Sequence, residues 1–310
     1  MSGTNTPDSA TPESDPPLAD ASEPSSRILS EKVTVYSSRS EIRSPAILLM
    51  AIYTGFMDGR GIAWRLFLRN LRGMYRQTVL GLFWAFLPPI ANTAMWIFLK
   101  SQKVFSIDDT GVDGTVYILT GMILWQAFID AFQMPADKMR SNKNMLSRIT
   151  FPRESLLLVG IGEVFFNLAI RLVLLVPAFI IFSVPLNWSI LLAPFAIIGL
   201  VFVGLGLGLL IMPIGSLYQD VGRFLAMMIP FWMIITPIIY VPFSGTQGFI
   251  LNCLNPASPL LITARDLLLV GGSAHWQIGL GYGLVSIPLV LLGLVVFRVS
   301  LPVLIERMQA

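Results

Sequence analysis

Side chains that build metal, redox and nucleotide sites are almost absent from this sequence. Cys253 is the single cysteine and His275 the single histidine among 310 residues. One cysteine excludes an intrachain disulfide, and so few soft ligands argue against a transition-metal site. No lysine follows a glycine, so the chain has no GxxxxGK(S/T) loop to hold nucleotide phosphates. We expect no metal, no cofactor and no catalytic residue in this chain.

Charge is also scarce. Charged residues make up 13% of the chain and hydrophobic residues 55%, a balance far from that of a soluble globular protein. Several windows of about 20 residues carry almost no charge, and a helix of this length crosses a hydrocarbon core of about 30 Å. The composition predicts an all-α polytopic membrane protein that does not bind nucleic acid.

Lysine and arginine are missing from residues 1–26, which contain five prolines and five acids. Such a stretch buries too little apolar area to offset the entropy of ordering it. It also lacks the basic start and apolar core of a signal peptide. We predict a disordered, acidic and proline-rich tail over residues 1–44.

Six apolar stretches are candidate spanning helices. We place them near 79–99, 115–134, 156–183, 188–216, 224–242 and 278–298. The fourth contains Gly204 and Gly208 in a GxxxG pair, which favours close helix packing. The sequence thus predicts a six-span membrane domain over residues 79–300, followed by a tail of residues 301–310.

Basic residues gather on one side of these spans. They lie in the N-terminal flank, in the connector 138–154 and at the C-terminal end, whereas an acidic loop with Asp108, Asp109 and Asp113 lies on the other side. Cytoplasmic loops carry the excess of lysine and arginine in membrane proteins. We therefore predict a multi-pass protein of the cytoplasmic (inner) membrane with both termini in the cytoplasm.

Residues 61–76 carry a stripe of arginines. At 100° per residue, the four basic side chains fall on one narrow arc, opposite an apolar arc. They are Arg65, Arg69, Arg72 and Arg76. A helix of this kind lies in the membrane interface with its arginines toward phospholipid headgroups. We predict a cytoplasmic membrane-interface helical region over residues 45–78, whose stripe suits an anionic lipid headgroup.

The segment 243–277 is too apolar to be an ordinary loop. Its FILNCL and LLITARDLLLV stretches predict two short helices separated at Asn255 and Pro256. We expect these helices to re-enter the membrane from the outer side. Re-entrant backbone is tolerated only where it packs on protein or lines a water-filled path.

The connector KMRSNKNMLSRITFPRE, residues 138–154, has the densest basic cluster of the chain. Membrane topology alone explains the charge of most basic loops. The apolar Met145, Leu146 and Phe151 beside Pro152 favour a second interpretation, a short amphipathic helix that docks on a soluble partner. From these residues both interpretations stay open.

Four blocks of the sequence resemble one known family. They are YRQTVLGLFWAFLPP (75–89), SNKNMLSRITFPRE (141–154), LYQDVGRFLAMMIPFWMIITPIIY (217–240) and LNPASPLLITARDLLLVGG (254–272). In this order, over about residues 61–300, they are similar to the permease subunit of polysaccharide, O-antigen and teichoic-acid ABC exporters. These are type-2 ABC permeases.

The resemblance implies a homodimer of six-span protomers that moves a lipid-linked polysaccharide through a channel between the two copies. Two copies of a cytoplasmic ABC ATPase would bind the ATP and Mg²⁺. The connector would be the coupling helix that inserts into the ATPase. Carried onto this chain, the coupling residues are Asn144, Met145, Leu146, Arg148, Phe151, Pro152, Arg153 and Glu154.

Aromatic residues are candidates for the substrate path, because sugar rings stack on aromatic faces. On the first predicted span they are Phe83, Trp84 and Phe86, on the second Trp125, and on the fifth Phe231, Trp232 and Tyr240. The resemblance places the first and fifth spans at or near the dimer interface. For the mid-span Trp125 and Trp232, packing in the protein core is the alternative interpretation.

Glu163, Asn167 and Arg171 repeat every four residues in the third predicted span and so share one helix face. Ionisable groups at membrane depth are costly and face protein or water. In one interpretation Arg171 pairs with a carboxylate or a carbonyl of another helix. In the other, Arg171 contacts the phosphates of a lipid-linked glycan. Asp130, near the inner end of the second predicted span, is a candidate partner in either role.

Three other functions remain as alternatives. A type-2 ABC permease for drugs or small lipids shares the architecture but needs no polymer channel. A secondary carrier ordinarily shows inverted repeats with paired broken helices, and the sequence has no repeated half. A structural membrane scaffold leaves the basic connector without a nucleotide-linked partner.

Overall fold

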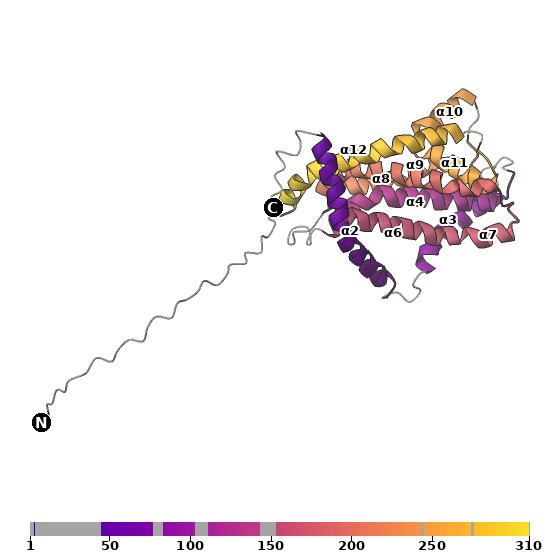
Figure 1. Cartoon of the computed structure of the whole chain (residues 1–310). Coiled ribbons are helices and arrows are strands. Elements are labelled where there is room, and N and C mark those ends of the chain that lie inside the picture. The colour runs from indigo at the N-terminus through magenta and orange to yellow at the C-terminus, as the bar shows by residue number, and fades with distance from the viewer. Residues whose placement is uncertain are drawn as a thin grey trace. The chain divides into compact units, whose positions relative to one another are not determined.

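The computed structural model describes residue 3 and residues 45–76, 83–102, 111–142, 153–242, 245–273 and 276–309. Every regular element in those ranges is a helix (Figure 1). The elements are α2 (Pro45–Arg76), α3 (Phe83–Ser101), α4 (Gly114–Ser141), α6 (Glu154–Val173), α7 (Leu175–Ile181), η1 (Trp188–Leu191), α8 (Ala193–Leu217), α9 (Gln219–Ile235), α10 (Gly245–Leu254), α11 (Ser258–Leu269) and α12 (Trp276–Gln309). Contacts divide the chain into Met1–Ser37 and Ser38–Ala310, and all of these helices belong to the second unit.

Helix α8 is the centre of the bundle, where it packs against α4, α11 and α12. Its glycines explain how two helices approach it so closely. A Cβ on Gly204 would lie 2.6 Å from the carbonyl oxygen of Phe128 in α4, and one on Gly206 would lie 2.7 Å from Cγ of Leu289 in α12. Residues two apart on a helix face nearly opposite directions, so α8 offers a small-residue surface to each neighbour. The predicted close packing at the glycine pair is confirmed on the α4 side.

Four of the described helical segments are long and apolar enough to cross a membrane. They are Gly114–Ser141, Glu154–Ile181, Ala193–Leu217 and Trp276–Leu304, and they correspond to the second, third, fourth and sixth predicted spans. The third is interrupted after Val173, because Pro177 cannot donate a backbone hydrogen bond to that turn. The predicted fourth span begins at residue 188, but Trp188–Leu191 is a separate 3-10 turn before α8.

The first and fifth predicted spans correspond to α3 and α9, which do not meet the same criterion among the described residues. Helix α3 has 19 residues and continues through Pro88 and Pro89. Helix α9 has 17 residues, and at 1.5 Å per residue it is about 26 Å long, shorter than a hydrocarbon core of about 30 Å. It starts at Gln219 and ends at Ile235, so the predicted bounds 224–242 lie too far toward the C-terminus at both ends of the helix.

The interface region is a single helix. Within the region predicted over 45–78, α2 runs without a break from Pro45 to Arg76. It packs on α6 and also contacts α12, and in Figure 1 it crosses the end of the bundle at which α12 finishes.

The segment 243–277 contains two short helices, as the sequence predicted, and their position at the outer side of a membrane stays a prediction. Helix α10 ends at Leu254 and α11 begins at Ser258, on either side of the predicted break. Helix α11 is almost wholly buried and packs against α8, α12 and α4, whereas α10 packs on α11. A helix as short as α11 is marginal in isolation, so its position depends on this burial.

The glycine surface of α8 generates a stability prediction. Gly204→Ala places a methyl group against the Phe128 carbonyl and forces α4 and α8 apart, which costs about 1–3 kcal/mol of unfolding free energy. Gly215→Ala is the matched control on the same helix, since its Cβ would meet nothing nearer than 4.0 Å. Replacing that glycine raises helix propensity by about 1 kcal/mol. In thermal unfolding in detergent, the melting temperature of Gly215→Ala should equal or exceed that of the unaltered protein, and that of Gly204→Ala should be lower. Equal melting temperatures for the two variants would contradict the close approach.

Candidate functional site

The connector that follows α4 lies mostly outside the described residues, which stop at 142 and resume at 153. The predicted coupling residues in this gap are Asn144, Met145, Leu146, Arg148, Phe151 and Pro152. Of the others, Arg153 precedes α6 and Glu154 is its first residue. The site is therefore built from the two helix ends between which the connector runs.

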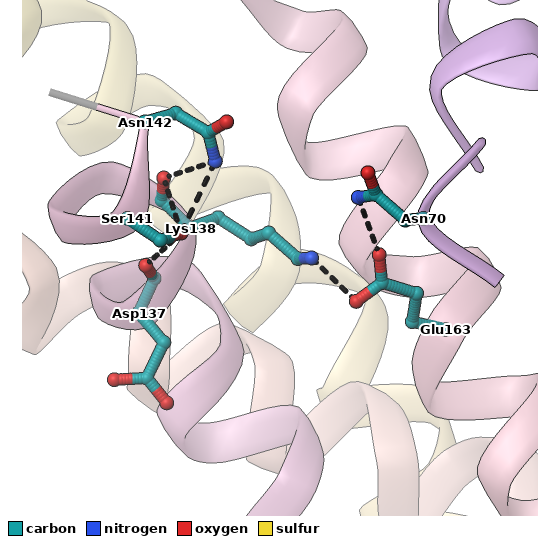
Figure 2. Close-up of polar contacts among 6 residues, drawn as sticks. All are labelled: Asn70, Asp137, Lys138, Ser141, Asn142 and Glu163. Atoms are coloured by element: carbon teal, nitrogen blue, oxygen red, sulfur yellow. Dashed lines mark hydrogen bonds and ion pairs between the residues drawn. The ribbon is translucent and has the colours of Figure 1, made fainter. Parts of the chain in front are cut away.

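One carboxylate joins three helices beside the start of the connector. Glu163 of α6 forms an ion pair with Lys138 of α4 through Oε2, and its Oε1 accepts a hydrogen bond of 2.9 Å from Nδ2 of Asn70 in α2 (Figure 2). The two charged side chains are only 15% and 13% exposed. With both oxygens occupied, Glu163 fixes the interface helix to the helix that leads into the connector.

A second carboxylate does the same where the connector ends. Glu154 accepts a hydrogen bond of 3.0 Å from Nη1 of Arg298 in α12, and the two side chains are 11% and 12% exposed. Gly55 of α2 lies against this carboxylate, since a Cβ there would be 2.8 Å from Cδ of Glu154. Only a residue without a side chain lets α2 pass so close. Helix α2 therefore rests on α6 beside Glu154 and is hydrogen-bonded to Glu163.

The last turn of α4 is capped by its own side chains. Nδ2 of Asn142 donates to the Lys138 carbonyl over 2.9 Å, and Oγ of Ser141 donates to the Asp137 carbonyl over 2.7 Å (Figure 2). Nη2 of Arg140 donates to the Gly215 carbonyl near the end of α8. A cation near a helix C-terminus also interacts favourably with the helix dipole. The turn that enters the connector is thus tied to α8 as well as to α6.

Helix α2 has three different faces. Its buried face packs on the bundle with Leu48, Ile52 and Ala63. A second face is apolar and exposed and carries Met50, Tyr53, Met57 and Trp64. The predicted arginines Arg65, Arg69 and Arg72 are exposed on a third face, and Arg76 is the final residue of the helix. This arrangement suits a helix at a membrane surface, with protein, acyl chains and headgroups on different sides.

Two of the predicted path residues lie together in an aromatic cluster. The ring of Trp232 in α9 meets the rings of Phe128, Phe132 and Trp125 in α4 edge to face, with centroids 5.1, 5.6 and 5.8 Å apart. Trp125 is 2% exposed. Nε1 of Trp232 also donates to Oδ1 of Asn255 over 3.0 Å. These contacts agree with the packing interpretation, and a role in the substrate path stays a prediction.

The other aromatic candidates are dispersed. Phe83 and Trp84 in α3 and Phe231 in α9 are exposed, Phe86 is half-buried, and the hydroxyl of Tyr240 donates to the Ile235 carbonyl over 2.7 Å. Exposed apolar residues form one stripe on α3 and another on α9. The first contains Trp84, Met95 and Phe98, and the second contains Phe224, Met227, Phe231 and Ile234. The α3 residues are separated by eleven and three positions and the α9 residues by three, four and three, so at 100° per residue each set falls on one helix side.

Arg171 forms an ion pair of 2.5 Å with Asp130 of α4, and the two side chains are 10% and 25% exposed. The structure thus contains the interhelical pair that the sequence suggested. Asn167 is half-buried on the same helix. Contact between Arg171 and a substrate phosphate stays a prediction.

Sequence reasoning missed the partners Lys138 and Asn70 of Glu163, and it missed the roles of Asn255 and Arg265. Arg265 of α11 is 1% exposed and lies over the ring of Tyr117, 3.8 Å from its centroid. Burial lowers the pKa of Arg265 from its ordinary value, while Tyr117 and Asp266 act in the opposite direction. An arginine within the apolar LLITARDLLLV stretch was a signal that could have been used, because embedded charges are rarely incidental.

Helices of spanning length and an amphipathic surface helix indicate a membrane protein. The ABC-2 type transporter family matches residues 63–260, and the chain belongs to this family. It is also 21% identical over 212 residues to the "O-antigen export system permease protein RfbA" of Myxococcus xanthus, covering 67% of this chain and 80% of that protein. The chain is therefore a type-2 ABC permease.

The three-helix junction at Glu163 generates a second prediction. Glu163→Gln keeps the shape and the contact with Asn70 but leaves Lys138 without its counter-charge, which costs about 3–5 kcal/mol where a pair is buried. Arg223→Ala is the control, because its pair with Asp220 is 78% and 93% exposed and such pairs contribute about 0–1 kcal/mol.

The measurement is thermal unfolding in detergent at neutral pH. Glu163→Gln should lower the melting temperature strongly, and adding Lys138→Met should restore much of it because the unpaired charge is then gone. Additive losses in the double variant would show that Lys138 and Glu163 do not act as a pair.

Proposed function

We propose that this protein is the channel-forming permease of an ATP-driven exporter that moves a lipid-linked polysaccharide across the cytoplasmic membrane. Membership of the ABC-2 family and similarity to a protein named as an O-antigen export permease support this substrate class. The chain has no nucleotide-binding loop of the GxxxxGK(S/T) type, so a separate ATPase would bind the ATP and Mg²⁺. Both termini would lie in the cytoplasm.

The proposal depends on the contacts of the two helix ends between which the connector runs. Two ion pairs, Lys138 with Glu163 and Glu154 with Arg298, join α4 to α6 and α6 to α12, and Asn70 joins α2 to Glu163. A displacement of these helix ends by a partner ATPase would therefore reach α2, α6 and α12. Charge pairs with little exposure suit this purpose because water screens them weakly.

The open sides of α3 and α9 support a homodimer. Both helices present large apolar side chains that are about half exposed, including Trp84 and Phe98 on α3 and Phe231 on α9. Stripes with a spacing of three and four residues are the surfaces that helices use to pack against each other. A second copy of the chain would cover them, and the path for the glycan would run between the two copies.

The faces of α2 support a role at the entry of the lipid carrier. Its exposed apolar face would lie among acyl chains, and its arginines would face anionic headgroups. A phosphate-bearing carrier lipid would meet the positive stripe before entering the path. Because Asn70 joins α2 to Glu163, the position of this helix would follow the connector.

Co-purification tests the partner. The tagged chain is isolated from native membranes, and every protein present in stoichiometric amount is identified by mass spectrometry. We expect one ABC ATPase, lost when Phe151→Ala and Arg153→Ala are combined and retained in the control Arg307→Ala, an exposed arginine outside the connector. The same cells should lose surface polysaccharide in the connector variant alone. A chain that purifies without any ATPase would overturn the proposal.

Thiol cross-linking tests the dimer. In a Cys253→Ser background, Phe231→Cys on the open stripe of α9 should give a disulfide-linked dimer on oxidation of native membranes. Phe195→Cys on α8 is the matched control, because that phenylalanine is 74% exposed but belongs to neither stripe. A dimer band of equal strength from both positions would show that collision, and not a specific interface, causes the cross-link.

A further inference from the structure

Arg265 is the largest of the side chains that the bundle buries completely. In the ranges that the structure describes, no carboxylate lies within ion-pair distance of its guanidinium. The neighbouring Asp266 instead accepts a hydrogen bond of 3.1 Å from Oγ of Ser273. A buried cation outside any ion pair is costly, so the contacts that it does make, with the ring of Tyr117 and with backbone carbonyls, need an explanation.

Those contacts are directed at the segment that follows α9. Nη1 of Arg265 donates to the Pro237 carbonyl over 2.7 Å and approaches the Ile238 carbonyl at 3.3 Å. Nε and Nη2 have no hydrogen-bond partner among the described residues. Within that part of the chain, the guanidinium therefore leaves two of its three nitrogens without hydrogen bonds, while the third bonds to two carbonyls at the outer end of α9.

Other groups hold the same short segment. Asn255 is buried in the turn between α10 and α11, donates to Oγ1 of Thr236 over 2.8 Å and accepts from Trp232. The hydroxyl of Tyr117 in α4 donates to the Tyr240 carbonyl over 3.3 Å. Residues 236–239 are buried as a result. The segment after α9 is therefore hydrogen-bonded at two positions ten residues apart in the sequence, Asn255 in the turn before α11 and Arg265 within α11.

The body of α9 contrasts with its end. Among the described helices α9 packs mainly on α8, and its Phe224, Met227 and Phe231 are exposed along one side. If only stability were required at position 265, an apolar side chain of similar volume would serve as well as a buried charge. A polar contact has another property, because its groups can exchange partners with water when the two elements separate.

We propose that Arg265 is a positioning residue that latches the outer end of α9 to α11 and keeps the outer exit closed. This rests on the proposed function, in which α9 borders the path. When the exit opens, the guanidinium exchanges the Pro237 and Ile238 carbonyls for water, and the segment 236–240 leaves α11. Removing the latch would raise the population of the open form without any change in the partner ATPase.

Dye release tests the latch without substrate or nucleotide. The purified complex is reconstituted into liposomes of phosphatidylethanolamine and phosphatidylglycerol loaded with carboxyfluorescein. Arg265→Met, which fills the space but cannot bond to carbonyls, should release dye several-fold faster than the unaltered protein. Arg265→Lys should fall between them, because lysine keeps the charge without the planar fork. Leu269→Met, a volume-conserving change at a buried position of α11, should release dye at the unaltered rate. Equal rates for Arg265→Met and the unaltered protein would overturn the proposal.

A cross-link gives a second measurement in case Arg265→Met does not accumulate. Thr236→Cys and Asn255→Cys, in a Cys253→Ser background, place two thiols at positions whose side chains are now hydrogen-bonded to each other, with Nδ2 of Asn255 2.8 Å from Oγ1 of Thr236. The oxidised protein should release no dye and export no polysaccharide, and reduction should restore export. Full export with the cross-link in place would contradict an exit that opens at this point. If the unaltered protein exports no polysaccharide at all, the proposed function fails, whereas the dye comparison still decides on the latch.

Discussion

A charge inside an apolar helical bundle must find a counter-charge or hydrogen-bond partners within the protein, because neither lipid nor a dry interior replaces water. In the described part of this chain, α6 carries one member of each of the three weakly exposed ion pairs. Glu154 pairs with α12, whereas Glu163 and Arg171 pair with α4. The arrangement of α4, α6 and α12 follows from satisfying these three charges. Asn70 then adds α2 to the same set through the second oxygen of Glu163.

Helix α8 is positioned by a different kind of interaction. It has no charged residue, and its contacts with α4 and α12 depend on glycines that face carbonyl and leucine atoms. Dispersion forces fall steeply with distance, so the absence of side chains at Gly204 and Gly206 is what allows a large contact area. In this bundle, ion pairs determine which helices pack on α6, and close glycine contacts determine which helices pack on α8. Together the two sets of contacts position α4 and α12.

Most helices were predictable from the sequence because apolar length and glycine or proline breaks are local signals. Residues 254–258 show this, since Asn255 and Pro256 separate α10 from α11 where the sequence indicated. The end of α9 was missed because Thr236 to Tyr240 are apolar enough to continue a span. Pro237 is the local signal for this end, since proline lacks a backbone N–H and disfavours a helical conformation of the residue before it. The bonds of Arg265 and Asn255 then hold the segment in place. Likewise, Glu163 was placed on the correct face with Arg171. Its partners Lys138 and Asn70 lie 25 and 93 residues away, and no local pattern connects them.

The two ends of the bundle are held by contacts of different kinds. Beside the connector the contacts are ion pairs with little exposure, and removing one partner of such a pair costs about 3–5 kcal/mol because the other charge stays buried. At the outer end of α9 they are hydrogen bonds from Arg265 and Asn255 to carbonyl and hydroxyl groups, and bonds of this kind contribute about 0.5–3 kcal/mol each. In the exporter that we propose, a strain that enters at the connector would pass through the ion pairs to α6 and α12. The exit would open where the hydrogen bonds of Arg265 and Asn255 exchange partners with water.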